Sequence, residues 1–186
     1  MSLKPYIIPR EDGSGVFIRT DNRPEGALDS PVQYAEEMAY VVFDGDKFIE
    51  DPEKKAAFEN ARANAEKKAA LETHLESIER KAEDLISNGV EYSGKTFACS
   101  CKAQGYLEKL AVRTLEHDEW NTLDESDHAA LDSQQIAELE QAVFSRIASI
   151  IKIKHESRRL ATIDAGNPLL SLEEFKNSDY TAGWTT

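Results

Sequence analysis

Residues 52–88 read PEKKAAFENARANAEKKAALETHLESIERKAEDLISN, and this segment organises the rest of the chain. After its first residue it contains no Pro or Gly, and it is rich in Ala, Glu, Lys and Leu, which favour helix most strongly. Asp51 can cap its start, Pro52 suits a first helical position, and Asn88-Gly89 is a helix stop. At 1.5 Å per residue the predicted helix is roughly 55 Å long. We therefore expect a long helix that links two small modules.

The two parts of this predicted helix differ in their large apolar side chains. Before Leu71 there is only Phe58, among many alanines. Beyond that point apolar residues recur at spacings of four, three, four and three, which is the pattern of a coiled-coil contact face over about two heptads. This 71–85 row consists of Leu71, Leu75, Ile78, Ala82 and Leu85. Two interpretations are open: the row packs on the chain's own C-terminal domain, or it pairs with a second copy of the chain.

Residues 1–50, before the helix, have the features of a small β-rich module. Apolar runs at 6–8 and 16–18 flank an Asp-Gly-Ser-Gly turn, which predicts a β-hairpin. Further runs at 39–43 and 47–49 flank Asp-Gly-Asp and predict a second hairpin, whereas residues 20–37 are loop-like.

Residues 89–166, after the helix, predict an α+β domain. A Ser-Gly turn between residues 90 and 97 indicates a hairpin, Ser100 can cap a helix over 101–115, and apolar runs around 124–127 indicate another hairpin. Asp132 and Gln135 form a capping-box pattern that opens a second long helix. The predicted fold class is α+β: a small N-terminal β module, a long charged linking helix (51–88), and a C-terminal domain of two short β-hairpins and two main helices. A polar tail follows at 167–186.

The second long helix has more apolar surface than one neighbour can cover. Ile136, Leu139, Val143, Ile147 and Ile150 form its predicted buried stripe. Other apolar residues widen this stripe, which predicts contact on two sides, either in a bundle or at a subunit interface. The aromatic residues of the polar tail either pack on their own domain or anchor a partner. The candidate interface residues are Leu71, Leu75, Ile78, Leu85, Phe144, Ile151, Ile153, Tyr180 and Trp184.

The charge balance excludes several classes of partner. With 35 acidic and 22 basic residues the net charge is −13, which argues against nucleic acid and against anionic membrane surfaces. No apolar run reaches the length of a membrane span. The first residues lack the apolar core of a secretory signal, which favours a cytoplasmic protein.

No residue pattern predicts catalysis, a metal or a cofactor. Cys99 and Cys101 are the only cysteines; their spacing is poor for a mutual disulfide, and two further metal ligands are missing. The acidic turns do not match the spacing of a calcium loop, and the Gly-rich segment 12–15 lacks the Lys and helix of a phosphate loop. These turns contain Asp44 and Asp46 in one case and Asp124, Glu125 and Asp127 in the other. We therefore expect a non-enzymatic protein without metal or cofactor.

Two segments carry a resemblance to a known family. Residues 86–104 read ISNGVEYSGKTFACSCKAQ, and residues 120–154 read WNTLDESDHAALDSQQIAELEQAVFSRIASIIKIK. Together they resemble an uncharacterised family of C-terminal domains in tail proteins of tailed phages and prophages. The residues that carry the likeness are Ile86, Gly89, Val90, Tyr92, Gly94, Phe97, Gln104, Trp120 and Thr122. Residues 40–63 also resemble tail-fibre assembly proteins. The chain departs from the family at Cys99-Ser100-Cys101, where acidic or small polar residues are usual.

The resemblance implies a tail or tail-fibre structural component, or a fibre-assembly chaperone, that acts by protein–protein contact. Its partners would be the tail fibre or other tail proteins, and its location the cytoplasm of the bacterial host during assembly or the virion tail. The 71–85 row adds the expectation of a homo-oligomer. The strong acidic charge leaves one alternative open: a prophage-encoded protein that binds or regulates host proteins with basic surfaces.

Overall fold

A computed structural model of the chain describes residues 3–113, 117–123 and 128–184. The fold is α+β, as the sequence predicts. The chain divides into two compact units, Met1–Glu66 and Lys67–Thr186. The long helix α1 (Pro52–Ser87) contributes its first part to the N-terminal unit and its second part to the C-terminal unit. The predicted linker is therefore not separate from the two modules, and the predicted tail belongs to the C-terminal unit.

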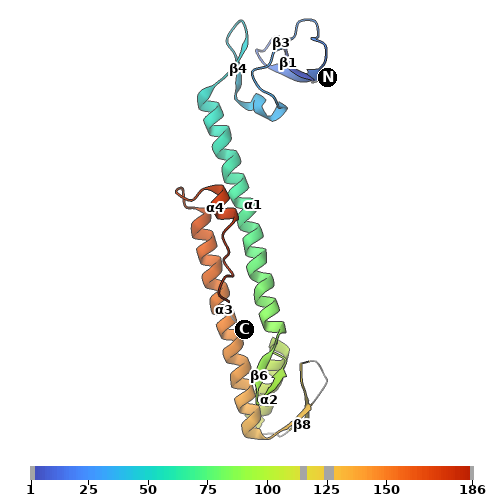
Figure 1. The fold of residues 1–186 in the computed structure, drawn as a ribbon, viewed down its shortest axis with the longest axis vertical. Coiled ribbons are helices and arrows are strands. Elements are labelled where there is room, and N and C mark those ends of the chain that lie inside the picture. The colour runs from blue at the N-terminus through green and yellow to red at the C-terminus, as the bar shows by residue number, and fades with distance from the viewer. Residues whose placement is uncertain (1–2, 114–116, 124–127, 185–186) are drawn as a thin grey trace. The chain divides into compact units, whose positions relative to one another are not determined.

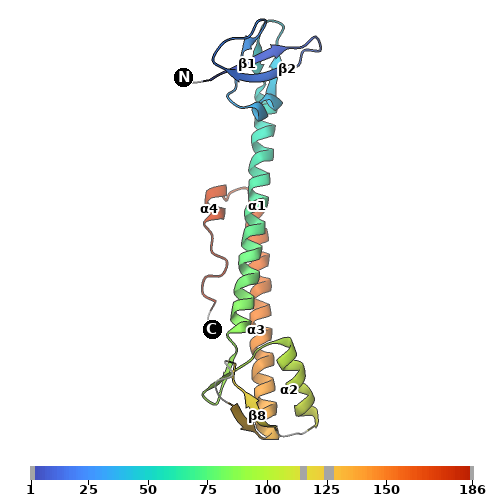
Figure 2. The ribbon, with the colours of Figure 1, turned by 90° about the vertical axis from the view of Figure 1, so that its right-hand side faces the viewer.

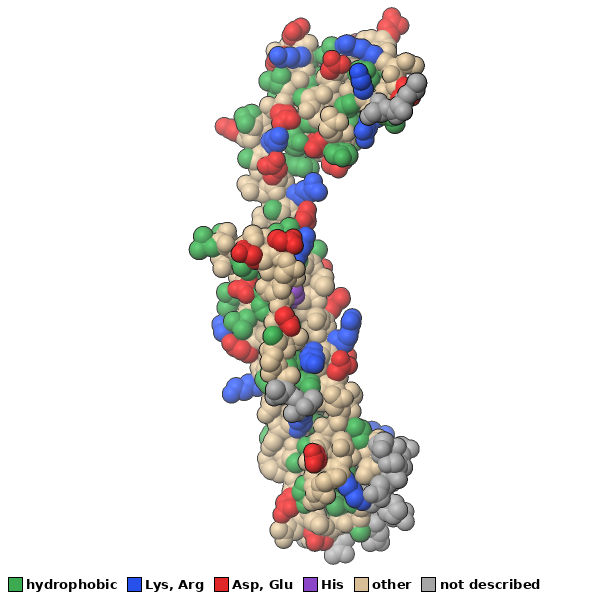
Figure 3. Space-filling view, in the orientation of Figure 1, with side chains coloured by type: hydrophobic (Ala, Val, Ile, Leu, Met, Phe, Trp, Pro, Cys, Tyr) green, Lys and Arg blue, Asp and Glu red, His purple; other side chains and the backbone are tan. Residues whose placement is uncertain are grey.

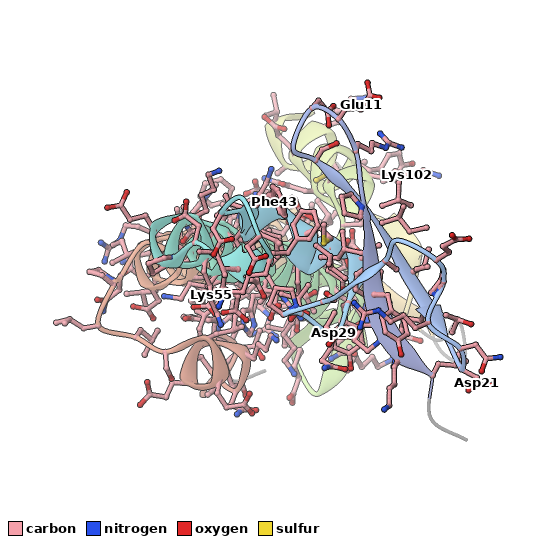
Figure 4. All side chains as sticks on the ribbon, turned by 90° about the horizontal axis from the view of Figure 1, so that it is seen from above. Glu11, Asp21, Asp29, Phe43, Lys55 and Lys102 are labelled. Atoms are coloured by element: carbon pink, nitrogen blue, oxygen red, sulfur yellow. The ribbon has the colours of Figure 1, made fainter. Side chains whose placement is uncertain are left out.

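The N-terminal unit is built on two small antiparallel sheets. Strands β1 (Lys4–Pro9), β2 (Gly15–Thr20) and β3 (Leu28–Asp29) pair in the order β2-β1-β3. Strands β4 (Val41–Phe43) and β5 (Phe48–Glu50) form the second predicted hairpin. The predicted strand at 39–43 starts later than expected, because its first two residues end a 3₁₀-helix, η1 (Ala35–Tyr40). In Figure 4, Glu11 and Asp21 lie at opposite ends of the β1–β2 hairpin.

Aromatic and aliphatic side chains hold these small sheets and the start of α1 together. Ile7 and Phe48 are buried beside Gly15, where any side chain would collide with both of them. The rings of Tyr40 and Phe58 meet edge to face at 5.4 Å. At the start of α1, Asp51 Oδ1 accepts hydrogen bonds from the backbone N–H groups of residues 53 and 54 at 3.0 and 3.1 Å. The predicted N-cap is thus confirmed.

The C-terminal unit contains the two predicted hairpins and the two predicted main helices. The hairpins are β6 (Val90–Tyr92) with β7 (Lys95–Phe97), and β8 (His117–Asn121) with β9 (His128–Leu131). Helix α2 (Cys101–Arg113) begins where expected, and the last two residues of its predicted span lie outside the described residues; α3 (Ser133–Ala165) opens with the predicted Asp132 and Gln135 capping box. A short helix, α4 (Leu172–Lys176), follows with its own capping box. The acidic turn at 124–127 lies outside the described residues.

Two apolar clusters fill the C-terminal unit. The larger packs α2 and the hairpins on the first part of α3; it contains Phe97, Cys99, Leu107, Leu110, Leu131, Ile136, Leu139, Val143 and Ile147. The smaller joins α1 to the middle of α3 through Ala82, Leu85 and Ile150. The second part of α1 and α3 lie side by side and antiparallel (Figures 1 and 2). No helix among the described residues is both long and apolar enough to cross a membrane.

Candidate interaction surface

The structure places most of the 71–85 row inside its own chain. Ile78 is fully buried, and Ala82 and Leu85 are nearly so, whereas Leu71 and Leu75 are half-buried. Leu85 packs with Ile150 of α3. Antiparallel α3 thus supplies the apolar face that a second copy would otherwise supply. This supports packing on the chain's own domain, and it corrects the expectation that Ile78 and Leu85 are available to a partner.

Charged side chains align the same two helices. Glu79 of α1 accepts hydrogen bonds from Lys154 Nζ at 2.9 Å and from Arg158 at 3.2 Å. The hydrogen bond from Lys154, followed by the charges of Lys154 and Arg158, lowers the pKa of Glu79. Lys154 and Arg158 of α3 are therefore engaged within the chain.

Residues 167–184, which we call the C-terminal strap, turn back from the end of α3 and lie on α1. Lys67 Nζ donates to the backbone oxygens of Asn167 and Leu170 at 3.0 and 2.7 Å. Seven residues along α1, His74 Nε2 lies 2.9 Å from the carbonyl oxygen of Phe175. That oxygen can only accept, so His74 is the donor. The Phe175 ring is fully buried and meets His74 edge to face at 5.0 Å.

The strap also reaches α3 through the two aromatic residues singled out in the sequence. Tyr180 donates its hydroxyl to Asp164 at 2.9 Å, and burial followed by this hydrogen bond raises the pKa of Tyr180. Trp184 Nε1 donates to Ser157 Oγ at 3.2 Å, and its ring packs on the Ala82–Leu85–Ile150 cluster. Both aromatic residues are half-buried on their own unit. They are therefore not free anchors in this conformation.

Exposed apolar side chains remain on α3, on either side of its buried stripe. Phe144 and Ile151, which we call the Phe144 row, are 50% and 41% exposed. Ile153 and Leu160, the Ile153 row, are 37% and 42% exposed. Members of each row are seven residues apart and share a face, whereas at 3.6 residues per turn Phe144 and Ile153 point in opposite directions. Phe144, Ile151 and Ile153 are thus exposed on two sides of α3, and their contact with a partner stays a prediction. Figure 3 shows hydrophobic side chains at the surface among charged ones.

The Ile153 row forms one wall of a groove of about 630 Å³ between α3 and the strap. Tyr180, Ala182 and Trp184 line its other side, and Lys152, Glu156 and Asp179 also border it. Leu160 was not among the predicted interface residues, although its position seven residues after Ile153 is a usable signal. The groove exists only because the strap runs beside α3. The spacing of residues along α3 alone does not reveal the path of the strap.

Asp44 and Cys99, two of the residues considered for chemistry, have structural roles. Asp44 Oδ1 accepts from the backbone N–H groups of Asp46 and Lys47 at 3.0 and 2.9 Å, and these hydrogen bonds lower the pKa of Asp44. Cys99 is buried, which raises the pKa of its thiol, and Cys101 is exposed; both are free thiols. No group of three or more His, Cys, Asp or Glu side chains among the described residues is placed to hold a metal ion. Asp124, Glu125 and Asp127 lie outside the described residues.

Comparison of the chain with protein-family models, with curated proteins and with solved structures found no match. The α3 surface and the groove beside it are therefore judged by their geometry. Apolar rows at helical spacing are suited to binding another polypeptide, since each side chain can enter a gap between side chains of a facing helix or strand.

Proposed function

We propose that the protein is a non-enzymatic component of a bacteriophage or prophage tail that acts by protein–protein contact. It would serve as a tail or tail-fibre structural part or as a fibre-assembly chaperone. The observation that carries the proposal is the exposed Phe144 row, on the opposite side of α3 from the Ile153 row. The sequence resemblance to phage and prophage tail domains supplies the biological setting.

The Phe144 row can contribute appreciable binding free energy. Burying the exposed half of such side chains removes somewhat less than 100 Å² of apolar surface each, or about 2 kcal/mol at 25 cal/mol per Å². A difference of that size changes a dissociation constant by more than about tenfold per residue. Phe144 is aromatic, the type of residue that most often dominates a protein interface. The row can therefore supply the apolar centre of a larger contact with a fibre or tail subunit.

The test compares purified particles with the pool of unassembled protein. A structural component is expected in purified particles at a fixed copy number, whereas a chaperone is expected bound to free fibre and absent from particles. Quantitative mass spectrometry of both fractions distinguishes these two roles. Absence from particles together with failure to co-purify with any tail protein would reject the proposal.

The residues of the surface are tested by Phe144→Ser together with Ile151→Ser. The double variant should reduce co-purification with the tail partner by more than about tenfold, because it removes the apolar contact. Val112→Ser is a matched control: Val112 is 79% exposed but lies on α2. The control should bind as the wild type does. Equal loss in both variants would place the contact elsewhere.

The acidic alternative predicts a different salt response. Binding of basic host proteins by the charge of −13 should weaken steeply as salt is raised, because exposed charges are screened. Binding through the Phe144 row should change little with salt. Repeating the capture at low and high salt therefore separates the two functions.

A further inference from the structure

The strap makes hydrogen bonds to α1 and to α3 at regular intervals along each helix. Its contacts on α1 fall at Lys67 and His74, and its contacts on α3 fall at Ser157 and Asp164. Each pair is seven residues apart, which places both members on one face of their helix. The strap therefore lies in the groove between two antiparallel helices, in the position that a third helix would take in a bundle.

A charge interaction also links the strap to α1. The α1 side presents Lys67 and His74, and Lys81 lies a further seven residues along. The strap carries Glu173, Glu174 and Asp179 against a single Lys176. Hydrogen bonds from Thr181 are the main reason that the pKa of Asp179 is lowered, and the charge of Lys81 contributes. Asp179 is thus the acidic residue of the strap that a basic residue of α1 influences.

Few apolar contacts hold the strap in place. Phe175 is its only fully buried residue among those described, and Tyr180 and Trp184 are half-buried. A second, open groove of about 630 Å³, distinct from the groove between α1 and α3 that the strap occupies, remains between the strap and α3. Releasing the strap therefore uncovers little surface compared with opening the α2–α3 core, and the strap belongs to the low-stability end of the unit.

The turn that connects α3 to the strap, which we call the joint, is packed against little else. Gly166 keeps a right-handed helical conformation and donates to the carbonyl oxygens of Thr162 and Ile163, so the reversal begins after it. Leu169, within the reversal, is 92% exposed. A joint of this kind can open without breaking a core. A terminal segment on such a joint can exchange between identical chains, because each copy carries both the segment and its groove.

We propose that the groove between α1 and α3 also receives the strap of a second copy of this chain, so that two copies associate by exchanging straps. Lys67, His74, Ser157 and Asp164 of each protomer then bind the strap residues of its partner through the contacts they otherwise make within one chain. In a dilute solution the attached strap prevails, because its effective concentration is on the order of millimolar. Exchange is favoured where copies are gathered at high local concentration. This inference does not depend on the proposed tail function.

The test shortens the joint in the full chain. Deleting Pro168 and Leu169 removes up to about 7 Å of reach, so the strap should no longer fold back on its own helices. The expected result is a dimer of twice the wild-type mass by light scattering, with unchanged helicity. Adding Phe175→Ser to the deletion should restore the monomer, because the strap then lacks its buried anchor. A Gly/Ser insertion after Leu169 is the matched control and should be monomeric at the same concentration.

Two results would overturn the proposal: a folded deletion variant that stays monomeric, or a dimer that Phe175→Ser does not dissociate. If the deletion lowers helicity, wild-type chains answer the same question. Tagged and untagged full-length chains are mixed at high concentration and examined by native mass spectrometry. Mixed dimers that disappear with Phe175→Ser in both chains support exchange, and absence of mixed dimers at every concentration rejects it.

Discussion

The two parts of α1 are both helical, but they differ in their large apolar residues and in their surroundings. In the part that belongs to the N-terminal unit, Phe58 is the only large apolar residue, and most side chains around it are exposed. In the part that belongs to the C-terminal unit, Ile78, Ala82 and Leu85 are buried. Local propensity favours helix throughout. Burial instead follows the spacing of large apolar residues, which begins only at Leu71. Helix length and helix packing are therefore specified by different features of the same stretch.

Truncating Ile78, the most buried side chain of α1, should reduce stability more than any other substitution considered. Ile78→Ala should lower the free energy of unfolding of the C-terminal unit by about 3 kcal/mol, because it leaves a cavity in addition to losing transfer free energy. Urea unfolding followed by tryptophan fluorescence measures this, since Trp120 and Trp184 both belong to that unit. Ala57→Ser, in the exposed part, should leave the fluorescence transition unchanged. Equal shifts in both variants would contradict the division of α1.

The next prediction concerns Gly89, which follows the C-terminal end of α1. Gly89 has a φ of +77°, and a side chain there would collide with the carbonyl oxygen of Phe97. Gly94 has nearly the same φ, +75°, but open space around it. Gly94→Ala should therefore cost about 1 kcal/mol from backbone conformation alone. Gly89→Ala should cost roughly 1 kcal/mol more, at the low end of the usual cost of overpacking.

Tryptophan fluorescence during urea unfolding reports both glycine variants, because both lie in the C-terminal unit. Because both glycines have nearly the same φ, the difference between the two variants reports only the collision of the added side chain with the carbonyl oxygen of Phe97. If both variants lose the same stability, the chain around Phe97 yields easily, and the end of α1 is not fixed by that contact.

Local sequence signals predicted most of the fold, because they act within a few residues. The caps at Asp51 and Asp132 and the stop at Gly89 mark helix ends through backbone hydrogen bonds or a positive φ. The hairpins follow from turn residues flanked by apolar runs. The predicted strand at 39–43 was too long, because Ala39 and Tyr40 belong to η1. Composition gave no signal for that short 3₁₀-helix.

The candidate surface was less predictable, since it depends on which helices meet. The spacing of Ile78 and Leu85 is compatible with packing inside one chain and with pairing of two chains. Only the antiparallel position of α3 beside α1 distinguishes these two arrangements. Phe144 and Ile151 could be selected because they lie beyond the predicted stripe of α3. The contacts of Lys67 with Asn167 and of His74 with Phe175 join segments about a hundred residues apart, so no local pattern reveals them.

The smallest expected effect concerns ion pairs in the two parts of α1. Glu66 pairs with Arg62 one turn away on the same helix at 3.1 Å, whereas Glu79 bridges to Lys154 and Arg158 of α3. The pair within one helix contributes about 0.3–0.5 kcal/mol. The side chain of Glu79 is 42% exposed, so solvent screens its pairs, and their contribution should stay below about 1 kcal/mol.

The sign of the pH dependence follows from the lowered pKa of Glu79. Its stabilisation is fully present above the ordinary value of 4.5 and is lost as the pH falls through the lower pKa of the folded state. Glu79→Gln should therefore be less stable than the wild type at pH 7, and the difference should shrink as the pH falls below 4.5. Urea unfolding at several pH values, followed by tryptophan fluorescence, measures the difference. Glu66→Gln is the control and should leave that transition unchanged. A Glu79→Gln deficit that persists at low pH would show that the carboxylate acts by packing and not by charge.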